Sequence, residues 1–295
     1  MALPIPTEPV DPCHLEECLA ALDASGFAPD DPQSVAHAAH WLARLAANRD
    51  FLGALALGEL KHACRRAGGQ GYSPQVMMLG AARPGWFMRA NIWPSPEEAV
   101  LRESGEAAFV YGLAHDHNFD FLTIGYHGPG YRSDHYEVDP DNVVGIVGEH
   151  VALRRTGSSI LKPGQVLHYR ARRDVHCQHA PVSLSVSINL MHSAAFQRWT
   201  DQYQYDLTTC TIGRVLTTCT GDALARLAMA LEPENARDVL DTIAAQHPVE
   251  RLRWSAIQAL ALTETDINAR RDIFTRYPLA GSGWLAQRCR AAIGD

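Results

Sequence analysis

The feature that most constrains this chain is a stretch, between residues 76 and 191, in which short apolar runs alternate with turn-forming residues. Many short strands with turns roughly 8–12 residues apart are typical of a β-sandwich or a small barrel. We therefore predict a β domain over residues 76–200. The apolar runs lie at residues 76–79, 86–93, 119–126 and 182–190, and the turns at residues 128–130, 139–142 and 163–164.

Both flanks of this β region are predicted to be helical, because apolar residues recur there at intervals of three and four. Residues 1–75 form one flank and residues 201–295 the other, in which residues 247–252 and the helix after them resemble a HEAT-type unit. A further helix is expected after Ser95, which precedes a proline and two glutamates. The N-terminal helices are expected at residues 12–24, from about residue 31 to 45, and from about residue 50 to 66 with an end at Gly68-Gly69.

Composition and charge narrow the classes of function. The chain has 295 residues and a formal net charge of −7, which argues against nucleic acid as the main partner, because phosphate binding is driven by clustered Lys and Arg. No apolar run approaches the roughly 20 residues of a membrane span, and no secretory signal is visible. The seven cysteines include no Cys-X-X-Cys pair, so a cytoplasmic location is predicted. A homodimer is compatible with this picture.

Histidines are concentrated in the β region. The chain has 14 histidines, and nine of them lie between His115 and His192. His115 and His117 are separated by one residue, Asp116. Because side chains alternate between the two faces of a strand, the two imidazoles are expected to point the same way and to reach a single ion, with Asp116 pointing away. This segment therefore predicts half of a metal site.

A second histidine-bearing segment follows the Pro163-Gly164 turn. It runs through a predicted strand and a short loop to His176, and an apolar strand begins soon afterwards at Val182. Together with the upstream His-X-His segment, this order resembles the two sequence motifs of the cupin superfamily. The resemblance covers about residues 76–191. It implies an α+β fold in which a central double-stranded β-helix barrel is flanked by the N-terminal helices and by the C-terminal helical segment.

The cupin resemblance also implies a mononuclear metal held by two histidines of the first motif and one of the second. His115 and His117 match the first motif. His176, about eleven residues past the Pro-Gly turn, is the preferred match in the second motif, and His168 and His179 remain alternatives. Neutral imidazoles bind several transition metals. Three ligands on one side of an ion leave positions for substrate and O2, which favours Fe(II).

Among metal cupins, the His-Asp-His segment is most similar to that of the thiol (cysteine) dioxygenase group. Many cupins carry a glutamate four or five residues after the second histidine, where this chain has Phe121 and Leu122. A three-histidine site without a carboxylate is therefore expected. Of the Ser-His-Tyr catalytic relay of thiol dioxygenases, only Ser183 is matched, since Ser185 and Ser187 stand at the other two places.

Candidate substrate and catalytic residues lie beside the first motif or on neighbouring predicted strands. Arginine suits bidentate capture of a carboxylate, so Arg89 and Arg132 are candidate substrate-binding residues, together with Tyr111. Tyr126 and Ser183 are candidate catalytic groups, the first because it follows the His-X-His segment closely and the second from the partial relay.

The sequence therefore predicts an enzyme, a mononuclear non-haem iron oxygenase that oxidises a small polar substrate, such as an amino acid or a carboxylic acid, with O2. Three alternatives stay open. The first is a non-oxygenase metal cupin, either an isomerase or a lyase. The second is a hydroxylase of the 2-oxoglutarate type, which requires His-X-Asp/Glu in place of His-X-His. The third is a cupin sensor whose helical tail binds a partner protein.

Overall fold

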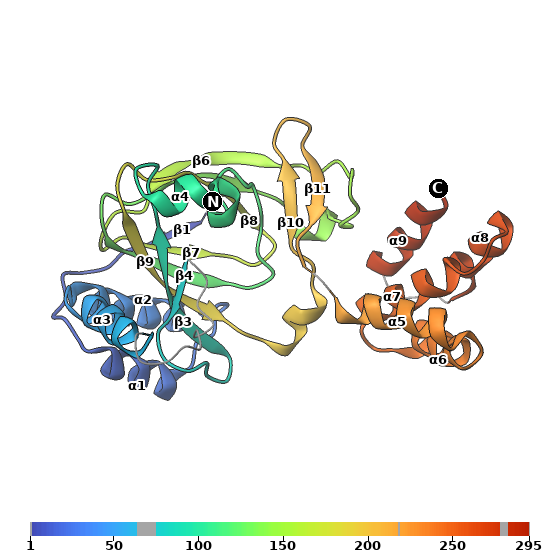
Figure 1. Ribbon diagram of the computed structural model, residues 1–295, viewed down its shortest axis with the longest axis horizontal. Helices are drawn as coiled ribbons and strands as arrows, with labels where there is room; N and C mark the ends of the chain where they lie inside the picture. The colour runs from blue at the N-terminus through green and yellow to red at the C-terminus, as the bar shows by residue number, and fades with distance from the viewer. Residues whose placement is uncertain (1, 64–74, 218, 278–282, 295) are drawn as a thin grey trace. The chain divides into compact units, whose positions relative to one another are not determined.

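The computed structural model describes residues 2–63, 75–217, 219–277 and 283–294 (Figure 1). Contacts within the chain divide it into two compact units. The first unit contains the N-terminal helices together with the sheets that carry the histidines, and the second is mainly helical. The first unit comprises Met1–Asp141, Val151–Ala195 and Gln204–Cys210, and the second comprises Asn142–His150, Phe196–Tyr203 and Thr211–Asp295.

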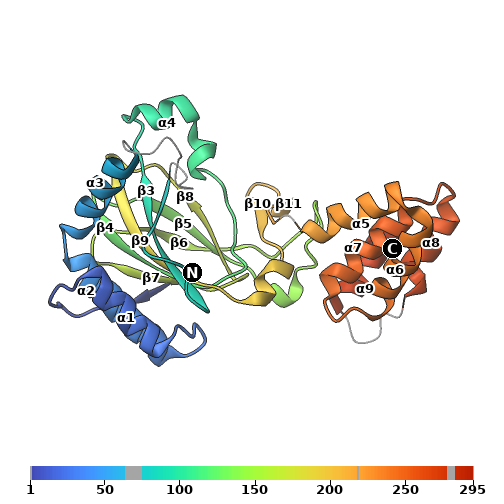
Figure 2. The same cartoon turned by 60° about the horizontal axis from the view of Figure 1, so that its bottom comes forward.

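Three helices, α1 (Leu15–Ser25), α2 (Pro32–Ala47) and α3 (Phe51–Ala63), begin the first unit. The predicted start of α2 is confirmed: the Asp31 side chain accepts a hydrogen bond from the Gln33 backbone N–H, and Pro32 is the first helical residue. The end predicted for α3 at Gly68-Gly69 lies outside the described residues. Apolar side chains of these helices form one core with one face of a sheet, which they cover in Figure 2.

The larger sheet has six strands in the order β1-β7-β4-β9-β3-β2, and a second sheet has three in the order β6-β5-β8. Neighbouring strands are antiparallel in both. In chain order the strands are β1 (Leu3–Ile5), β2 (Val76–Met78), β3 (Trp86–Trp93), β4 (Phe121–His127), β5 (Arg132–Glu137), β6 (Arg154–Ile160), β7 (Val166–Tyr169), β8 (Asp174–Gln178) and β9 (Ser185–His192).

The two sheets correct the expected barrel, because the described strands do not close into one hydrogen-bonded ring. Side chains nevertheless meet between the sheets. The ring of Tyr169 on β7 lies 4.6 Å, centroid to centroid, from that of His176 on β8, and Phe121 on β4 lies 6.3 Å from the same ring. The sheets therefore pack face to face. Strand β1 was not expected, since a three-residue strand interrupted by Pro4 has no readable alternation.

Alternation along β3 decides which side chains enter the space between the sheets. Met88 and Ala90 belong to the core shared with the N-terminal helices. Phe87 and Arg89 therefore point to the other face, toward the second sheet. The helix expected to begin at Pro96, just after Ser95, begins three residues later, as α4 (Ala99–Ser104), because Ser95 hydrogen-bonds the Glu98 carboxylate in a preceding turn.

The second unit contains five helices among its described residues, and their core includes Trp254, Ile257 and Leu260. The HEAT-like character expected of this segment is not confirmed. No helix in the described ranges is both long and apolar enough to cross a membrane. The five α-helices of the second unit are α5 (Thr220–Leu231), α6 (Pro233–Gln246), α7 (Glu250–Ala261), α8 (Ile267–Arg276) and α9 (Gly283–Ile293).

The chain also contains a two-stranded sheet of β10 (Tyr203–Asp206) and β11 (Thr211–Val215), and 3-10 helices at Glu106–Phe109, Pro140–Asn142 and Ala195–Trp199.

Candidate metal centre

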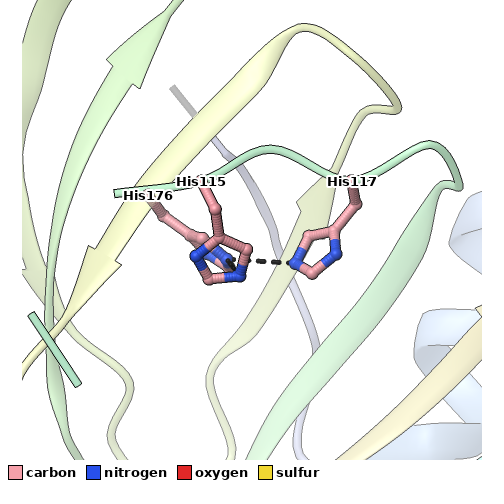
Figure 3. Close-up of side chains that lie close together, drawn as sticks. All are labelled: His115, His117 and His176. Atoms are coloured by element: carbon pink, nitrogen blue, oxygen red, sulfur yellow. Dashed lines mark hydrogen bonds between the residues drawn. The ribbon is translucent and has the colours of Figure 1, made fainter. Parts of the chain in front are cut away.

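Three histidines converge between the two sheets (Figure 3). His176 lies on β8, whereas His115 and His117 lie in the segment that precedes β4. The prediction that these two lie on a strand of the sheet is therefore wrong. An isolated antiparallel bridge replaces the strand: the backbone N–H of His115 donates to the His176 carbonyl, and that of His176 donates to the His115 carbonyl, each at 3.0 Å. The bridge sets the two ligand segments side by side.

The ring nitrogen of His176 is spaced from those of the other two histidines as a metal ion requires. His176 Nε2 lies 3.1 Å from His117 Nε2 and 3.3 Å from His115 Nε2. One ligand atom from each histidine falls within 4.8 Å of the others. Because imidazole binds an ion such as Zn²⁺ at about 2.0–2.1 Å, two bound nitrogens at octahedral or tetrahedral angles are about 2.8–3.4 Å apart. The two separations from His176 Nε2 match this range, and a small closing movement of His115 and His117 toward each other would let all three bind one ion.

The environment favours the neutral form of His115 and His176, which is the form that binds metals. Burial lowers the pKa of His115, although its hydrogen bond to the Leu113 backbone opposes this. Burial lowers the pKa of His176 well below its usual value, and the neighbouring histidines reinforce the effect. His115 Nδ1 lies 2.9 Å from the Leu113 carbonyl. Donation from Nδ1–H to that oxygen fixes the tautomer that leaves Nε2 free for an ion.

Aromatic rings form the wall beside the histidines. Phe119 and Phe121 lie 4.8 Å and 5.0 Å from the His117 ring, and Tyr169 stacks on Phe121 at 4.7 Å. Burial raises the pKa of Tyr169 well above its usual value, so its hydroxyl stays protonated. Rings on this side reduce the access of water to the three nitrogens and strengthen electrostatic interactions there.

Two residues from β10 hold the His-X-His segment from the side away from the ring nitrogens. The Tyr205 backbone N–H donates to the Ala114 carbonyl at 2.8 Å, and Gln204 forms a bridge with His115. The Tyr205 hydroxyl lies 3.0 Å from a carboxylate oxygen of Asp116, which is 1% exposed. Sequence reasoning missed Tyr205, because nothing in the local pattern links it to a segment 89 residues earlier.

The two alternative third ligands lie elsewhere. His168 is on β7, where side chains alternate, and its neighbour Tyr169 is the residue that contacts the site. The His168 Nε2 atom lies 3.5 Å from a carboxylate oxygen of Asp120. His179 follows β8, and its Nε2 lies 2.7 Å from a carboxylate oxygen of Asp134. The structure therefore brings His176 to the pair, and neither alternative.

The two catalytic candidates do not join the histidines. Tyr126 faces the N-terminal helices: its hydroxyl donates to the Asn48 carbonyl at 3.0 Å, and its ring lies 5.4 Å from that of Phe51. Burial raises the pKa of this tyrosine. Ser183 is exposed in the loop before β9. Alternation along β4 turns Tyr126 toward the helices, and Ser183 lies in a loop, so neither side chain joins the three histidines in this structure; their catalytic roles stay predictions.

The three substrate candidates fall in different environments. Tyr111 is buried against Trp93 and Phe109, and its hydroxyl donates to a backbone carbonyl. Arg132 is exposed at the start of β5, lies 3.1 Å from Asp134, and lines a groove of about 830 Å³ that contains none of the three histidines. Arg89 alone points into the space between the sheets.

Comparisons with known proteins leave the family open. No family model matches the chain, and no curated protein matches it. Among solved structures, a hydroquinone 1,2-dioxygenase in complex with Cd²⁺ and 4-hydroxybenzonitrile is 13% identical with a TM-score of 0.27, over 43% of this chain and 68% of that one. The DMSP lyase DddQ from Ruegeria pomeroyi DSS-3 is 12% identical with a TM-score of 0.24, over 66% and 79%.

A mannose-6-phosphate isomerase candidate from Ralstonia eutropha JMP134 is 14% identical with a TM-score of 0.23, over 43% of this chain and 91% of that one. These proteins differ from one another in the reactions that their names describe, and the TM-scores are low. The case for a function therefore rests on the side chains of this chain itself.

Proposed function

We propose that this chain is a mononuclear non-haem iron oxygenase of the cupin type that acts on a small carboxylate-bearing substrate. The observation that carries the proposal is the convergence of three imidazoles, in which His176 Nε2 lies 3.1 Å from His117 Nε2 and 3.3 Å from His115 Nε2. A set of three histidines leaves open coordination positions, as an oxygenase requires. Ferrous iron bound there would supply the coordination and reduction of O2.

The protein residues would hold the ion, orient the imidazole rings and shield the site from water. His115, His117 and His176 would bind the ion through Nε2. The bridge between the two ligand segments and the hydrogen bond to Leu113 orient the rings. The aromatic wall limits water, which protects reactive species from side reactions.

The 2-oxoglutarate alternative receives less support from the same residues. It needs a carboxylate in the place of the second histidine. The carboxylate of Asp116 instead bonds the Tyr205 hydroxyl, and the described residues of the metal-binding group include no carboxylate. A three-histidine oxygenase is therefore the better match.

The test is metal content combined with oxygen uptake. Protein prepared anaerobically with iron should hold about one iron per chain. It should consume one O2 for each molecule of substrate oxidised when it is supplied with a series of small amino acids and carboxylic acids. Turnover without oxygen consumption would identify a lyase or an isomerase in its place. Failure to retain any transition metal would end the proposal.

The substrate class follows from Arg89. Its Nε atom is buried without a hydrogen-bond partner among the described residues. Burial lowers the pKa of this guanidinium, and Tyr131 nearby opposes the shift. The residue as a whole is half-buried, and a buried N–H without an acceptor costs about 1–3 kcal/mol. The arrangement is explained if a ligand supplies the missing anion.

The position of Arg89 suits an anion that also reaches the metal. Arg89 pairs across the sheet with Asn189, which accepts a hydrogen bond from Thr123 at 2.5 Å. Thr123 and Asn189 are cross-strand neighbours, and Phe121, two residues from Thr123 on the same face of β4, contacts the His117 ring. Two residues of a strand span about 7 Å. A small carboxylic acid or amino acid has the length to join the guanidinium to the ion.

Replacement of Arg89 by methionine should raise stability while it removes function. Because Arg89→Met removes a half-buried guanidinium whose Nε lacks a partner, and keeps most of the volume, we expect the ligand-free protein to gain about 1 kcal/mol in the free energy of unfolding. Turnover of carboxylate substrates should be lost. Urea unfolding and oxygen uptake measure the two effects.

The matched control is Arg132→Met, which removes an exposed arginine and its pair with Asp134. This change should cost no more than about 1 kcal/mol and leave turnover intact. If Arg89→Met proved strongly destabilising, Arg89 would have a structural partner and the substrate assignment would be wrong.

A further inference from the structure

Gln178 is a fourth polar group beside the three histidines. It lies two residues beyond His176 on β8, so the two side chains share a face of the three-stranded sheet. Its side chain is buried, with 6% of the residue exposed. The Gln178 carbonyl accepts a hydrogen bond from the Gly112 N–H at 2.9 Å, which ties this end of β8 to the segment that carries His115.

The amide of Gln178 lies over the ring of His176. Its Nε2 atom is 3.1 Å from His176 Nε2 and 3.3 Å from His176 Nδ1. A group bonded in the ring plane to Nδ1, about 2.9 Å away, would be more than about 4 Å from Nε2. Because the two distances are nearly equal, Gln178 does not lie in the ring plane beside Nδ1, where a residue that accepts the Nδ1–H hydrogen bond of a metal-bound histidine would lie. The amide is instead next to the nitrogen that would bind the ion.

Binding of a metal changes what this amide can do. A metal-bound His176 uses its Nε2 lone pair for the ion and carries a proton on Nδ1. Neither nitrogen can then accept a hydrogen bond from the amide of Gln178. The Oε1 atom of the same amide is buried without a partner among the described residues. A buried donor without an acceptor is unfavourable, so an acceptor from outside the chain would be stabilised here.

We infer that the amide N–H of Gln178 donates a hydrogen bond to the non-protein ligand of the metal. This role rests on the proposed function, since it requires the ion. The ligand must carry a lone pair, and a ligand oxygen or a small anion bound beside the three histidines meets that condition. Gln178 is thus assigned as a residue that stabilises and orients what binds in an open coordination position.

The experiment uses cobalt-loaded protein and azide as the ligand. Cobalt content and the visible spectrum without azide report the protein ligands, and a titration with azide reports the open position. In Gln178→Leu we expect unchanged cobalt content and an unchanged azide-free spectrum. The dissociation constant for azide should rise about tenfold or more, because a hydrogen bond to an anion is lost.

Two further variants separate this role from others. Gln75→Leu makes the same change at a buried glutamine whose amide donates to the Phe109 carbonyl, and azide should bind as it does to the unmodified protein. Gln178→Glu keeps the shape but cannot donate when ionised and repels an anion. Its azide affinity should fall at least as far as that of Gln178→Leu.

The outcomes are distinct. An unchanged azide affinity in Gln178→Leu overturns the inference while the metal centre stands. Lower cobalt content or an altered azide-free spectrum also overturns it, since Gln178 would then be a ligand of the ion itself. If the unmodified protein takes up no cobalt, the metal centre is contradicted, and the role of Gln178 with it.

Discussion

His176→Ala is expected to abolish stoichiometric metal binding. The His176 Nε2 atom lies 3.1 Å and 3.3 Å from the two other candidate ligand atoms, so its loss leaves two imidazoles and removes the central member of the set. Loss of an outer partner of a metal ligand costs 10–100-fold in affinity, and loss of the ligand itself should exceed about 100-fold. Metal analysis after dialysis, on protein whose circular dichroism is unchanged, measures the effect.

His168→Ala is the matched control. It removes a histidine that is also buried, at 5% exposure, and that belongs to the same sequence segment. Its imidazole lies beside Asp120 rather than beside the three convergent rings. Metal content should therefore remain close to one ion per chain. Loss of metal in His168→Ala, with retention in His176→Ala, would reverse the assignment of the third ligand.

Arg251→Met is expected to give the largest loss of stability in the second unit. The Arg251 side chain is 9% exposed and lies 3.3 Å from Asp201 and 2.7 Å from Asp222. The Asp201 side chain is 3% exposed. Removal of one partner from a buried ion pair costs about 3–5 kcal/mol when the other charge is left uncompensated, and because Arg288 remains 3.4 Å from Asp201 we expect the lower end of that range. Urea unfolding followed by the helical circular dichroism signal measures the change.

Arg237→Met supplies the comparison for that experiment. It removes an arginine from another helix of the same unit, where the pair with Glu264 is 43% and 28% exposed. Solvent screens such a pair, so its loss should cost no more than about 1 kcal/mol. Equal costs for the two substitutions would contradict the difference in burial on which the prediction depends. Arg288, which lies 3.4 Å from Asp201, limits the loss in Arg251→Met.

Local patterns predicted much of the secondary structure. The apolar run at residues 86–93 is strand β3 with those bounds, and the helix predicted from about residue 31 begins at Pro32. These features depend on a few consecutive residues, which is why the sequence reveals them. The sheet order, by contrast, joins β3 to β9 and β9 to β4. Such pairings depend on packing between distant segments, and periodicity does not encode them.

The sequence predicted two of the three histidines of the site, but not the third one uniquely. His115 and His117 are close in sequence, and their convergence follows from spacing even though the segment is bridged rather than part of a sheet strand. The third histidine could be His176, His168 or His179 from the sequence. The tertiary structure decides which histidine is the third. The register of β8 against β5 pairs His176 with His135, and the His176 ring contacts Tyr169.

The sequence alone therefore determined that this chain combines a β region with helical flanks and carries a paired-histidine segment, since spacing and alternation are local properties. The tertiary structure decided which histidine completes the group, that Arg89 and not Arg132 points between the sheets, and that Tyr126 faces the helices. It also placed the Gln178 amide over the His176 ring. The physical reason is that burial and contact arise from segments far apart in the chain, whose meeting no local spacing records.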